Sequence, residues 1–355
     1  MQSGVSAGKQ ETGERSSDES CGKDPRAVKK REILGWAMFD FANSGYTTVV
    51  ISVMYSGVFS NNIVPAESAL RTTYWSISMI ISTVIAMVLS PWVGAICDYS
   101  GHKKYYLAAS AVVCSLFTAL LFFVNPGDVW LAVMLVAVSN AGFMLSESFC
   151  GSFLTDLATK KNMGRISGIG WAIGYFGGLA SLLVYQQMVT VDQSSGLYMR
   201  QVQWAMVGNA LFFLVGSIPT FVFVRERARA RSGFESVGAS GWIMAGYREI
   251  KRLFAIPPSH RNLLKFLLAF MVYYAGLEVV IKFVGIYTQA ELHMNPGELV
   301  TLFLILQVSA ALGSVCFGVL EAYIGPKNTV LATLVWWVMG TLGIFFLKDI
   351  ALFVS

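Results

Sequence analysis

The feature that most restricts the fold of this chain is a series of uninterrupted apolar runs along its 355 residues. Several reach the roughly 18 apolar residues that a helix needs to cross a bilayer. Because backbone polar groups in hydrocarbon must bond one another, these runs are predicted to be helices. Composition agrees, since 55% of the residues are hydrophobic and 13% are charged, against about 25% charged in soluble domains. We predict an all-α polytopic membrane protein.

The apolar runs divide the chain into four parts. Residues 1–31 are polar and charged, which indicates a disordered cytoplasmic tail without a cleavable signal peptide. We expect residues 32–224 to form an N-terminal six-helix bundle, and the linker 225–262 to lead to a partial C-terminal bundle at 263–355. The predicted complete spans are 34–59, 73–97, 105–124, 129–153, 165–190, 201–224, 263–288, 298–320 and 328–347. A further run begins at Ile350.

The basic residues between the spans predict the orientation of the chain. With the N-terminus in the cytosol, the outward segments hold only Arg71, Arg200 and Lys348 of the 26 lysines and arginines, and Lys282 lies inside a span. This distribution follows the positive-inside rule. The net charge of +5 therefore reflects membrane topology, and it does not indicate a nucleic-acid partner.

The linker 225–262 has a sequence pattern of its own. Apolar and basic residues alternate at helical spacing between Trp242 and Ile256, and Pro257 and Pro258 end the pattern. This spacing is typical of a helix that lies at the cytoplasmic membrane surface. We interpret the segment as a connection between two bundles, with a site for a regulatory protein partner as the alternative.

The sequence predicts neither a disulfide framework nor a metal site. Four of the five cysteines lie in or beside apolar runs without CxxC spacing, where they serve as small packing residues. The histidines His102, His260 and His293 lie in different loops. No Ser/His/Asp constellation or phosphate-binding glycine loop lies at membrane depth, so the sequence indicates neither an enzyme nor a bound cofactor.

Charged residues within the spans are the strongest candidates for function, because a charge at mid-bilayer costs roughly 2.5–3.5 kcal/mol. They are Asp40 in the first span, Glu147 in the fourth, and Glu278 with Lys282 in the seventh. Glu278 and Lys282 lie four residues apart and can pair, so a structural ion pair and a functional site are equally open there. Asp40 and Glu147 have no cation within a helical turn of the same span, which favours a binding role.

The first span also carries a predicted polar stripe. Asp40, Asn43, Ser44 and Thr47 follow the spacing i, i+3, i+4, i+7, which places them on one face of an otherwise apolar helix. We therefore expect the solute or a coupling ion to contact this face. The predicted binding residues are Asp40, Asn43, Glu147, Glu278 and Lys282.

A charged, glycine-containing turn separates the second and third spans. It reads Gly94-Ala-Ile-Cys-Asp98-Tyr-Ser-Gly101-His-Lys103-Lys104. We expect Gly94 to allow close helix approach and Gly101 to permit a tight turn. The lysines would hold the turn at the inner membrane face, and Asp98 at a helix end can bind cations or a helix N-terminus.

The spacing of this turn resembles the loop signature of the major facilitator superfamily, with Tyr99 and His102 where that superfamily usually has arginines. The resemblance implies that Gly94, Asp98, Gly101, Lys103 and Lys104 take part in conformational change. A degenerate copy, Gly318-Val-Leu-Glu321-Ala-Tyr-Ile-Gly325-Pro-Lys327, follows the eighth span and supports an internal repeat. In the superfamily the first, fourth, seventh and tenth spans line the central cavity, and the membrane charges of this chain fall on the first, fourth and seventh.

Further motifs are similar to those of a narrower branch. The first span opens with Gly35-Trp-Ala-Met-Phe-Asp-Phe-Ala-Asn-Ser-Gly-Tyr46, and the fifth with Gly164-Arg-Ile-Ser-Gly-Ile-Gly-Trp-Ala-Ile-Gly-Tyr-Phe-Gly-Gly178, after Leu154-Thr-Asp-Leu-Ala158. These resemble the branch that includes the fungal vacuolar amino-acid effluxer of autophagy and its bacterial permease relatives. The resemblance implies transport across a bacterial inner (plasma) membrane or a vacuole-like organelle membrane. A complete second half would add about three spans beyond residue 355, so we expect either an incomplete sequence or a naturally short member.

Together these observations predict a secondary transporter of a small polar solute that works by alternating access. Amino acids are one candidate solute, and protons or cations are candidate coupling ions. Two alternatives stay open: a shortened, non-transporting scaffold or receptor that acts through its linker, and a drug-type efflux permease, which the deep charges disfavour. The expected partners are the solute and the lipid bilayer.

Overall fold

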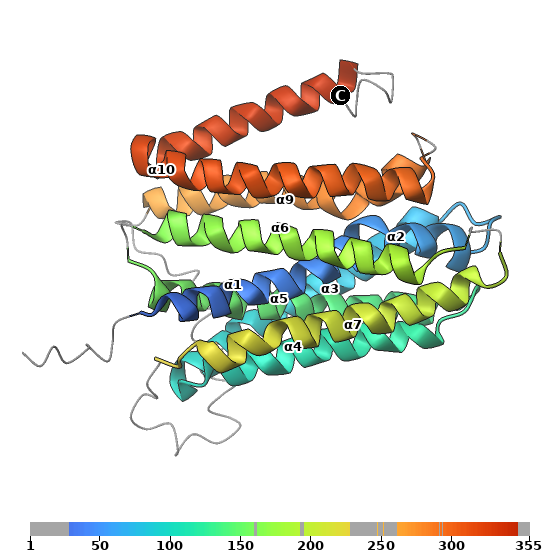
Figure 1. The fold of residues 1–355 in the computed structure, drawn as a ribbon, viewed down its shortest axis with the longest axis horizontal. Coiled ribbons are helices and arrows are strands. Elements are labelled where there is room, and N and C mark those ends of the chain that lie inside the picture. The colour runs from blue at the N-terminus through green and yellow to red at the C-terminus, as the bar shows by residue number, and fades with distance from the viewer. Residues whose placement is uncertain are drawn as a thin grey trace, which may run out of the picture.

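The computed structural model of the protein consists of long helices that run side by side (Figure 1). It describes residues 28–159, 162–191, 195–227, 247, 251, 261–290, 292 and 294–346. Within these residues every regular element is a helix and none is a strand. Seven of the described helices are long and apolar enough to cross a membrane. The predicted all-α polytopic class is confirmed.

The second to sixth predicted spans each form one main helix. Their bounds are α3 (Arg71–Ser100), α4 (Lys103–Leu120) with the short 3-10 turn η3 (Leu121–Phe123), α5 (Val129–Leu157), α6 (Met163–Met188) and α7 (Tyr198–Phe223). Most of these helices begin or end a few residues outside the predicted spans. The reason is that a backbone hydrogen-bond ladder can continue into polar residues after the apolar run has ended.

The first span departs from the continuous α-helix that we predicted. After α1 (Lys30–Tyr46) come the π-helical segment η1 (Thr47–Val53), the single α-turn α2 (Tyr55–Val58) and a second π-helical segment η2 (Phe59–Ile63). The sequence of η1 consists almost wholly of β-branched residues, which are stiff and have low helix propensity. Every residue from 48 to 60 is buried, so this span lies at the centre of the molecule.

The last three predicted spans lie in α9 (Arg261–Ala290) and α10 (Pro296–Phe346). Two of them lie within α10. They are separated by a break at Gly325, which has a φ of 80° and is followed by Pro326. Glycine adopts this left-handed φ without strain, and proline supplies no N–H to the ladder. The ribbon reverses direction at this point (Figure 1).

Two sequence predictions fall on parts of the chain that the structure describes only at isolated positions or not at all. The predicted tail 1–31 lies outside the described residues as far as residue 27, and the predicted interfacial helix at 242–256 is described only at Tyr247 and Lys251. The division of the chain into four parts therefore stays a prediction.

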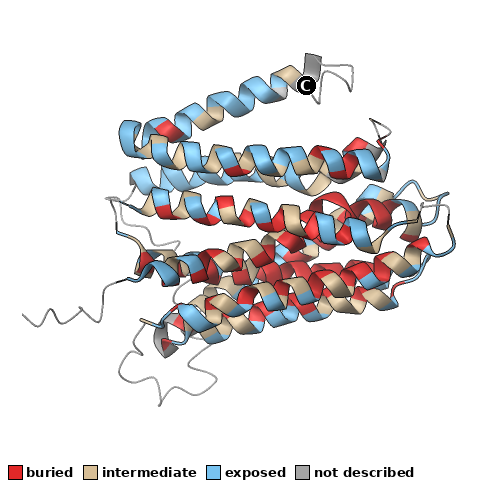
Figure 2. Cartoon of the chain, viewed as in Figure 1, coloured by how far each residue is buried: buried red, intermediate tan, exposed pale blue. Residues whose placement is uncertain are grey.

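Packing joins the helices into a bundle around the first span. α1 packs on α6 and α7, α5 packs on α3 and α4, and α10 packs on α6. Figure 2 shows buried residues concentrated in the first six spans and exposed residues covering α9 and α10. The exposed side chains are mostly large and apolar, as expected of a surface that faces lipid.

The described basic residues Lys103, Lys104 and Arg227 lie together at one end of the bundle, near the start of α1, which we call the basic end. There the Arg227 guanidinium lies 2.7 Å from Glu32 Oε2, and Lys104 Nζ donates a 2.9 Å hydrogen bond to the carbonyl of Phe221. The opposite end, here called the far end, carries Asn61 and the turn at Gly127, whose N–H donates to the carbonyl of Ile63 at 2.9 Å.

Candidate functional site

Contacts between α1 and α5 bring the first two predicted binding residues together. Trp36 Nε1 donates a 2.9 Å hydrogen bond to the carbonyl of Cys150, which fixes the two helices against each other. Cys150 Sγ lies 4.0 Å from Asp40 Oδ1. Because Glu147 precedes Cys150 by three residues on α5, both lie on the same face, and the charges of Asp40 and Glu147 are close enough to interact.

The other two charged residues form an ion pair on α9. Lys282 Nζ lies 2.8 Å from Glu278 Oε2, with exposed side-chain fractions of 15% and 29%. Both residues are close enough to Glu147 for their charges to act on it. All four membrane charges therefore belong to one group, the charge cluster, defined as Asp40, Glu147, Glu278 and Lys282.

A row of glycines on α6 lies against the polar face of α1. A Cβ added to Gly170 would lie 3.1 Å from Asp40 Oδ2, and one added to Gly174 would lie 3.0 Å from Ser44 Oγ. These distances leave almost no room for a side chain. These glycines therefore serve close helix packing, because their small size lets α6 approach the candidate site.

Asn43, the remaining predicted binding residue, is buried with an exposed fraction of 6%. Asp40 and Ser44 share the face toward α6, as predicted. The next residue on the face toward α6 is Thr48, which lies beside Gly178. The predicted stripe contained Thr47 at this point instead. The change to π-helix at Thr47 alters the angle between successive residues, which the α-helical spacing rule does not anticipate.

The turn between α3 and α4 matches the prediction in part. Gly101 has a φ of 70°, and its N–H bonds the carbonyl of Cys97 at 2.9 Å, so it ends α3 as a tight turn. The close helix approach predicted at Gly94 is not seen among the described residues, where a Cβ added to Gly94 would meet no atom within 4 Å. Asp98 lies in the last turn of α3, and its side chain falls outside what the structure describes.

The two lysines of this turn bind other helices. Lys103 Nζ forms a 2.9 Å ion pair with Asp156 Oδ2 at the end of α5. Lys104 binds a second partner besides Phe221: its backbone N–H donates a 3.0 Å hydrogen bond to Glu226 Oε2. The lysines thus connect α4 to the ends of α5 and α7, which is a more specific arrangement than the predicted attraction to the membrane face.

The degenerate second copy of the turn also makes a defined contact. Glu321 lies so close to Gly164, in the first turn of α6, that any side chain there would collide with its carboxylate. A carboxylate at a helix N-terminus interacts favourably with the helix dipole. One turn further, a Cβ on Gly168 would lie 2.9 Å from the carbonyl of Ser314. Small residues therefore hold α10 against α6.

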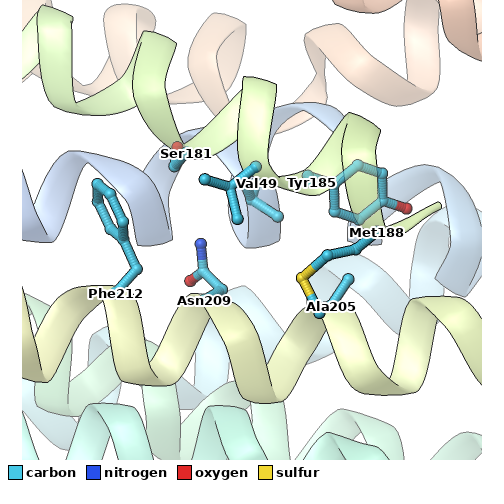
Figure 3. Close-up of a pocket in the computed structure, with 8 residues that line it drawn as sticks. Val49, Ser181, Tyr185, Met188, Ala205, Asn209 and Phe212 are labelled. Carbon is cyan, nitrogen blue, oxygen red and sulfur yellow. The ribbon is translucent and has the colours of Figure 1, made fainter.

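A small pocket lies between η1, α6 and α7 (Figure 3), and no residue of the charge cluster lines it. Its interior volume is about 10 Å³, which holds about one water molecule. Asn209 Nδ2 donates to the carbonyl of Gly45 at 3.1 Å, so this residue mainly joins α7 to α1. None of the predicted binding residues lines the pocket, and we assign the candidate site to the charge cluster.

Sequence reasoning missed several residues around the site. Cys150 had been interpreted only as a packing residue, although its position three residues after Glu147 signals a shared face. Gln307 Nε2 donates a 3.0 Å hydrogen bond to Thr48 Oγ1, and no spacing within either helix predicts a contact between residues so far apart in the sequence. The ion pair of Glu32 with Arg227 was missed for the same reason.

The fold and the charge cluster define a multi-pass α-helical membrane protein with ionisable groups held between its helices. The chain matches the family described as "Vacuole effluxer Atg22 like" over residues 62–350, and it belongs to that family. The resemblance inferred from the first-span, fifth-span and loop motifs is thereby confirmed. The match also agrees with the expectation that the chain is not an enzyme.

Curated relatives are similar over most of this chain. It is 27% identical over 322 residues to the "Uncharacterized MFS-type transporter YxiO" of Bacillus subtilis, covering 86% of this chain and 71% of that protein. It is 21% identical to "Autophagy-related protein 22" of Candida glabrata, covering 79% and 59%, and 23% identical to the Pichia angusta protein of that name, covering 88% and 64%. The chain thus spans less than two thirds of the length of the two fungal relatives.

Among solved structures, the chain is similar to the xylose transporter XylE from E. coli in a partially occluded inward-open conformation. The sequence identity is 17%, the TM-score is 0.46, and the match covers 85% of this chain and 72% of that chain.

Proposed function

We propose that this protein is a secondary transporter whose solute, or the ion that drives it, binds at the charge cluster. The observation that carries the proposal is that Asp40 of α1 lies 4.0 Å from Cys150 on the face of α5 that carries Glu147, and that the Glu278–Lys282 ion pair of α9 lies within range of the Glu147 charge. The cluster therefore joins the two parts of the chain that alternating access would move. Family membership and the name of the bacterial relative support the same function.

The chemistry of the cluster favours a solute that carries an amine. Three carboxylates and a single lysine are present, and Lys282 is already paired with Glu278. Asp40 and Glu147 lie within range of each other's charge, and neither forms an ion pair with a cation among the described residues. A proton, a cation or an ammonium group relieves the repulsion between two such carboxylates. A zwitterionic amino acid also supplies a carboxylate for Lys282, which makes amino acids suitable candidates.

The basic end supplies a route to the cluster. Gly151 lies one turn beyond Glu147 on α5, it is exposed, and a Cβ there would meet no atom of the described residues within 4 Å. Within the described part of the chain, no side chain covers the face of α5 that carries Glu147 at this position. We place this end in the cytosol because the predicted cytosolic lysines and arginines gather there, and the solute would then enter or leave the cluster from the cytosolic side.

The test is transport by the purified protein in sealed vesicles, with a panel of labelled amino acids, simple amines and neutral polyols. We expect at least one amine-bearing solute to cross faster than into protein-free vesicles. Asp40→Asn and Glu147→Gln remove charge but keep shape, and each should abolish this transport while the protein still inserts. Glu67→Gln, at an exposed carboxylate outside the cluster, is the matched control and should keep the wild-type rate.

Three outcomes would contradict the proposal. Wild-type rates in both cluster variants would show that the carboxylates do not bind the solute or its coupling ion. Transport of polyols alone would show that the cluster does not select amines. Loss of the inserted protein in both variants, with normal insertion of Glu67→Gln, would show instead that the two carboxylates are structural.

A further inference from the structure

The first span carries an oxygen-bearing side chain at every fourth position. This set, called the hydroxyl row, consists of Asp40, Ser44, Thr48, Ser52, Ser56 and Ser60. In a regular α-helix, residues four apart are displaced by about 40° around the axis, so the row would wind around the helix. A π-helix has about 4.4 residues per turn, so residues four apart there are displaced by about 33° in the opposite sense. The π-helical segments η1 and η2 therefore offset the winding of the α-helical parts, which keeps the row closer to one side of the span.

Contacts fix the surroundings of the half of the row that lies nearer the basic end. Asp40 and Ser44 lie against the glycine row of α6, as described above. Thr48 Oγ1 accepts the hydrogen bond from Gln307 Nε2 of α10, so its own O–H is left to donate elsewhere. This half of the row therefore runs along the boundary between α1, α6 and α10.

The half nearer the far end contains hydroxyl groups that lack partners. Ser52 and Ser60 are 4% and 5% exposed, and within the described part of the chain their Oγ atoms have no hydrogen-bond partner. Ser56 Oγ, between them, donates to the carbonyl of Ser52 at 3.3 Å and can still accept. A buried hydroxyl without a partner costs about 1–3 kcal/mol, so each of these groups calls for a polar neighbour such as water.

The spacing of the row suits water. Four residues rise by about 6 Å along an α-helix and by roughly 5 Å along the wider π-helix, which is too far for a direct bond between hydroxyl oxygens of about 2.8 Å. A single water between successive hydroxyls can bond both of them, because a hydroxyl donates one hydrogen bond and accepts others. The row ends beside Asn61, which is exposed at the far end.

We propose that the hydroxyl row is a hydrated path along which water and protons reach Asp40 from the far end of the bundle. Alternating waters and hydroxyls form a continuous chain of donors and acceptors to the carboxylate. At Asp40 the path reaches Cys150 of α5 and comes within range of the Glu147 charge. Helix α6 presents only glycines to Asp40. The charges of Glu278 and Lys282 on α9 act on Glu147. What the path serves rests on the proposed transport function, whereas its hydration does not.

The first test uses silver ions, which are small and bind thiolates. The natural cysteines are replaced, and single cysteines are introduced on the row as Ser52→Cys, Ser56→Cys and Ser60→Cys. The controls are Val50→Cys and Val53→Cys, at positions that are also buried but lie off the row. Protein in sealed vesicles is exposed to silver and then unfolded, and the remaining thiols are counted with a fluorescent maleimide. We expect the row positions to react at least about tenfold faster than the valine positions. Equal rates would overturn the proposal.

The second test asks whether the path reaches Asp40. Silver is added to Asp40→Cys from the far end and, separately, from the basic end, with and without the added change Ser56→Val. The ratio of the two rates should fall about tenfold when Ser56 is replaced, because valine removes the hydroxyl but keeps a similar volume. An unchanged ratio would overturn the proposal. Since silver labelling needs no solute, failure here is distinct from failure of the transport assay.

Discussion

Helices α5 and α9 have the same mean hydropathy of 1.9 over their apolar cores, yet 61% of the core residues of α5 are buried and none of those of α9 are. Helix α5 packs between α3 and α4 in the bundle formed by the first six spans, and it carries Glu147. Helix α9 contacts few other helices of the described chain. Hydropathy therefore identifies a membrane span without telling whether protein or lipid surrounds it.

The difference follows from how helices associate in a bilayer. Lipid chains are as apolar as leucine, so burial of apolar surface gives no net drive for association there. Close contacts depend on small residues and hydrogen bonds instead. The first bundle has both, as in the glycines of α6 against α1, whereas the faces of α9 carry bulky residues such as Phe266, Phe270 and Met271, all exposed.

The largest predicted effect comes from adding one carbon atom at a helix contact. A Cβ on Gly177 would overlap the backbone carbonyl of Phe41 in α1, whereas one on Gly340, in the second limb of α10, would meet no atom of the described residues within 4 Å. We expect Gly177→Ala to lower the free energy of unfolding by about 1–3 kcal/mol or more, because neither backbone can yield easily. The measurement is unfolding of the purified protein in mixed micelles with increasing SDS.

Gly340→Ala is the matched control for this change. Alanine favours a helix over glycine by up to about 1 kcal/mol, and no neighbour opposes it, so its free energy of unfolding should stay equal or rise slightly. Equal losses at both positions would mean that the contrast between the two regions is not one of helix contact.

A smaller effect is expected at the ion pairs. Glu32 is 1% exposed and its partner Arg227 is 22% exposed. Burial by itself opposes ionisation of Glu32, but the Arg227 guanidinium and the backbone N–H of Lys29 outweigh it and hold the pKa of Glu32 below its ordinary value. Arg227→Gln leaves a buried carboxylate unpaired, so we expect a loss of about 1–3 kcal/mol at neutral pH. Lys282→Gln, at the more exposed pair on α9, should cost less.

The depressed pKa of Glu32 also sets the sign of the pH dependence. A group whose pKa is lower in the folded protein stabilises it above its unfolded pKa of about 4.3, and that contribution is lost as the pH falls through the folded value. Unfolding titrations between pH 7 and pH 3 should therefore show the difference between wild type and Arg227→Gln shrinking with acid. A difference that grows on acidification would contradict the assignment.

The same contrast explains how far the sequence predicts this molecule. The spans follow from the length of the apolar runs, the reversal from the backbone freedom of Gly325, and the candidate site from the cost of burying a charge. Each of these signals lies in a short stretch of sequence. Contacts such as that of Cys150 with Asp40 need the relative rotation of two helices. In lipid this rotation depends on a few small residues, which apolar periodicity does not reveal. The π-helical segments were missed because helix rules assume a constant number of residues per turn.

The smallest predicted effect lies at the junction of the two regions, where Gln307 of α10 donates its hydrogen bond to Thr48 of the first span. A double-mutant cycle with Gln307→Leu and Thr48→Val should give a coupling of about 0.5–1.5 kcal/mol in the SDS unfolding assay, since the bond is partly buried. A matched pair exists within the first bundle, where Gln201 Nε2 donates to Thr190 Oγ1 at 3.2 Å in an exposed position. Water competes for that bond, so the corresponding cycle should give a coupling near zero. A coupling near zero in both cycles would show that the hydrogen bond from Gln307 adds nothing to the attachment of the second region, which then depends on its other contacts, such as those of the α6 glycines with α10.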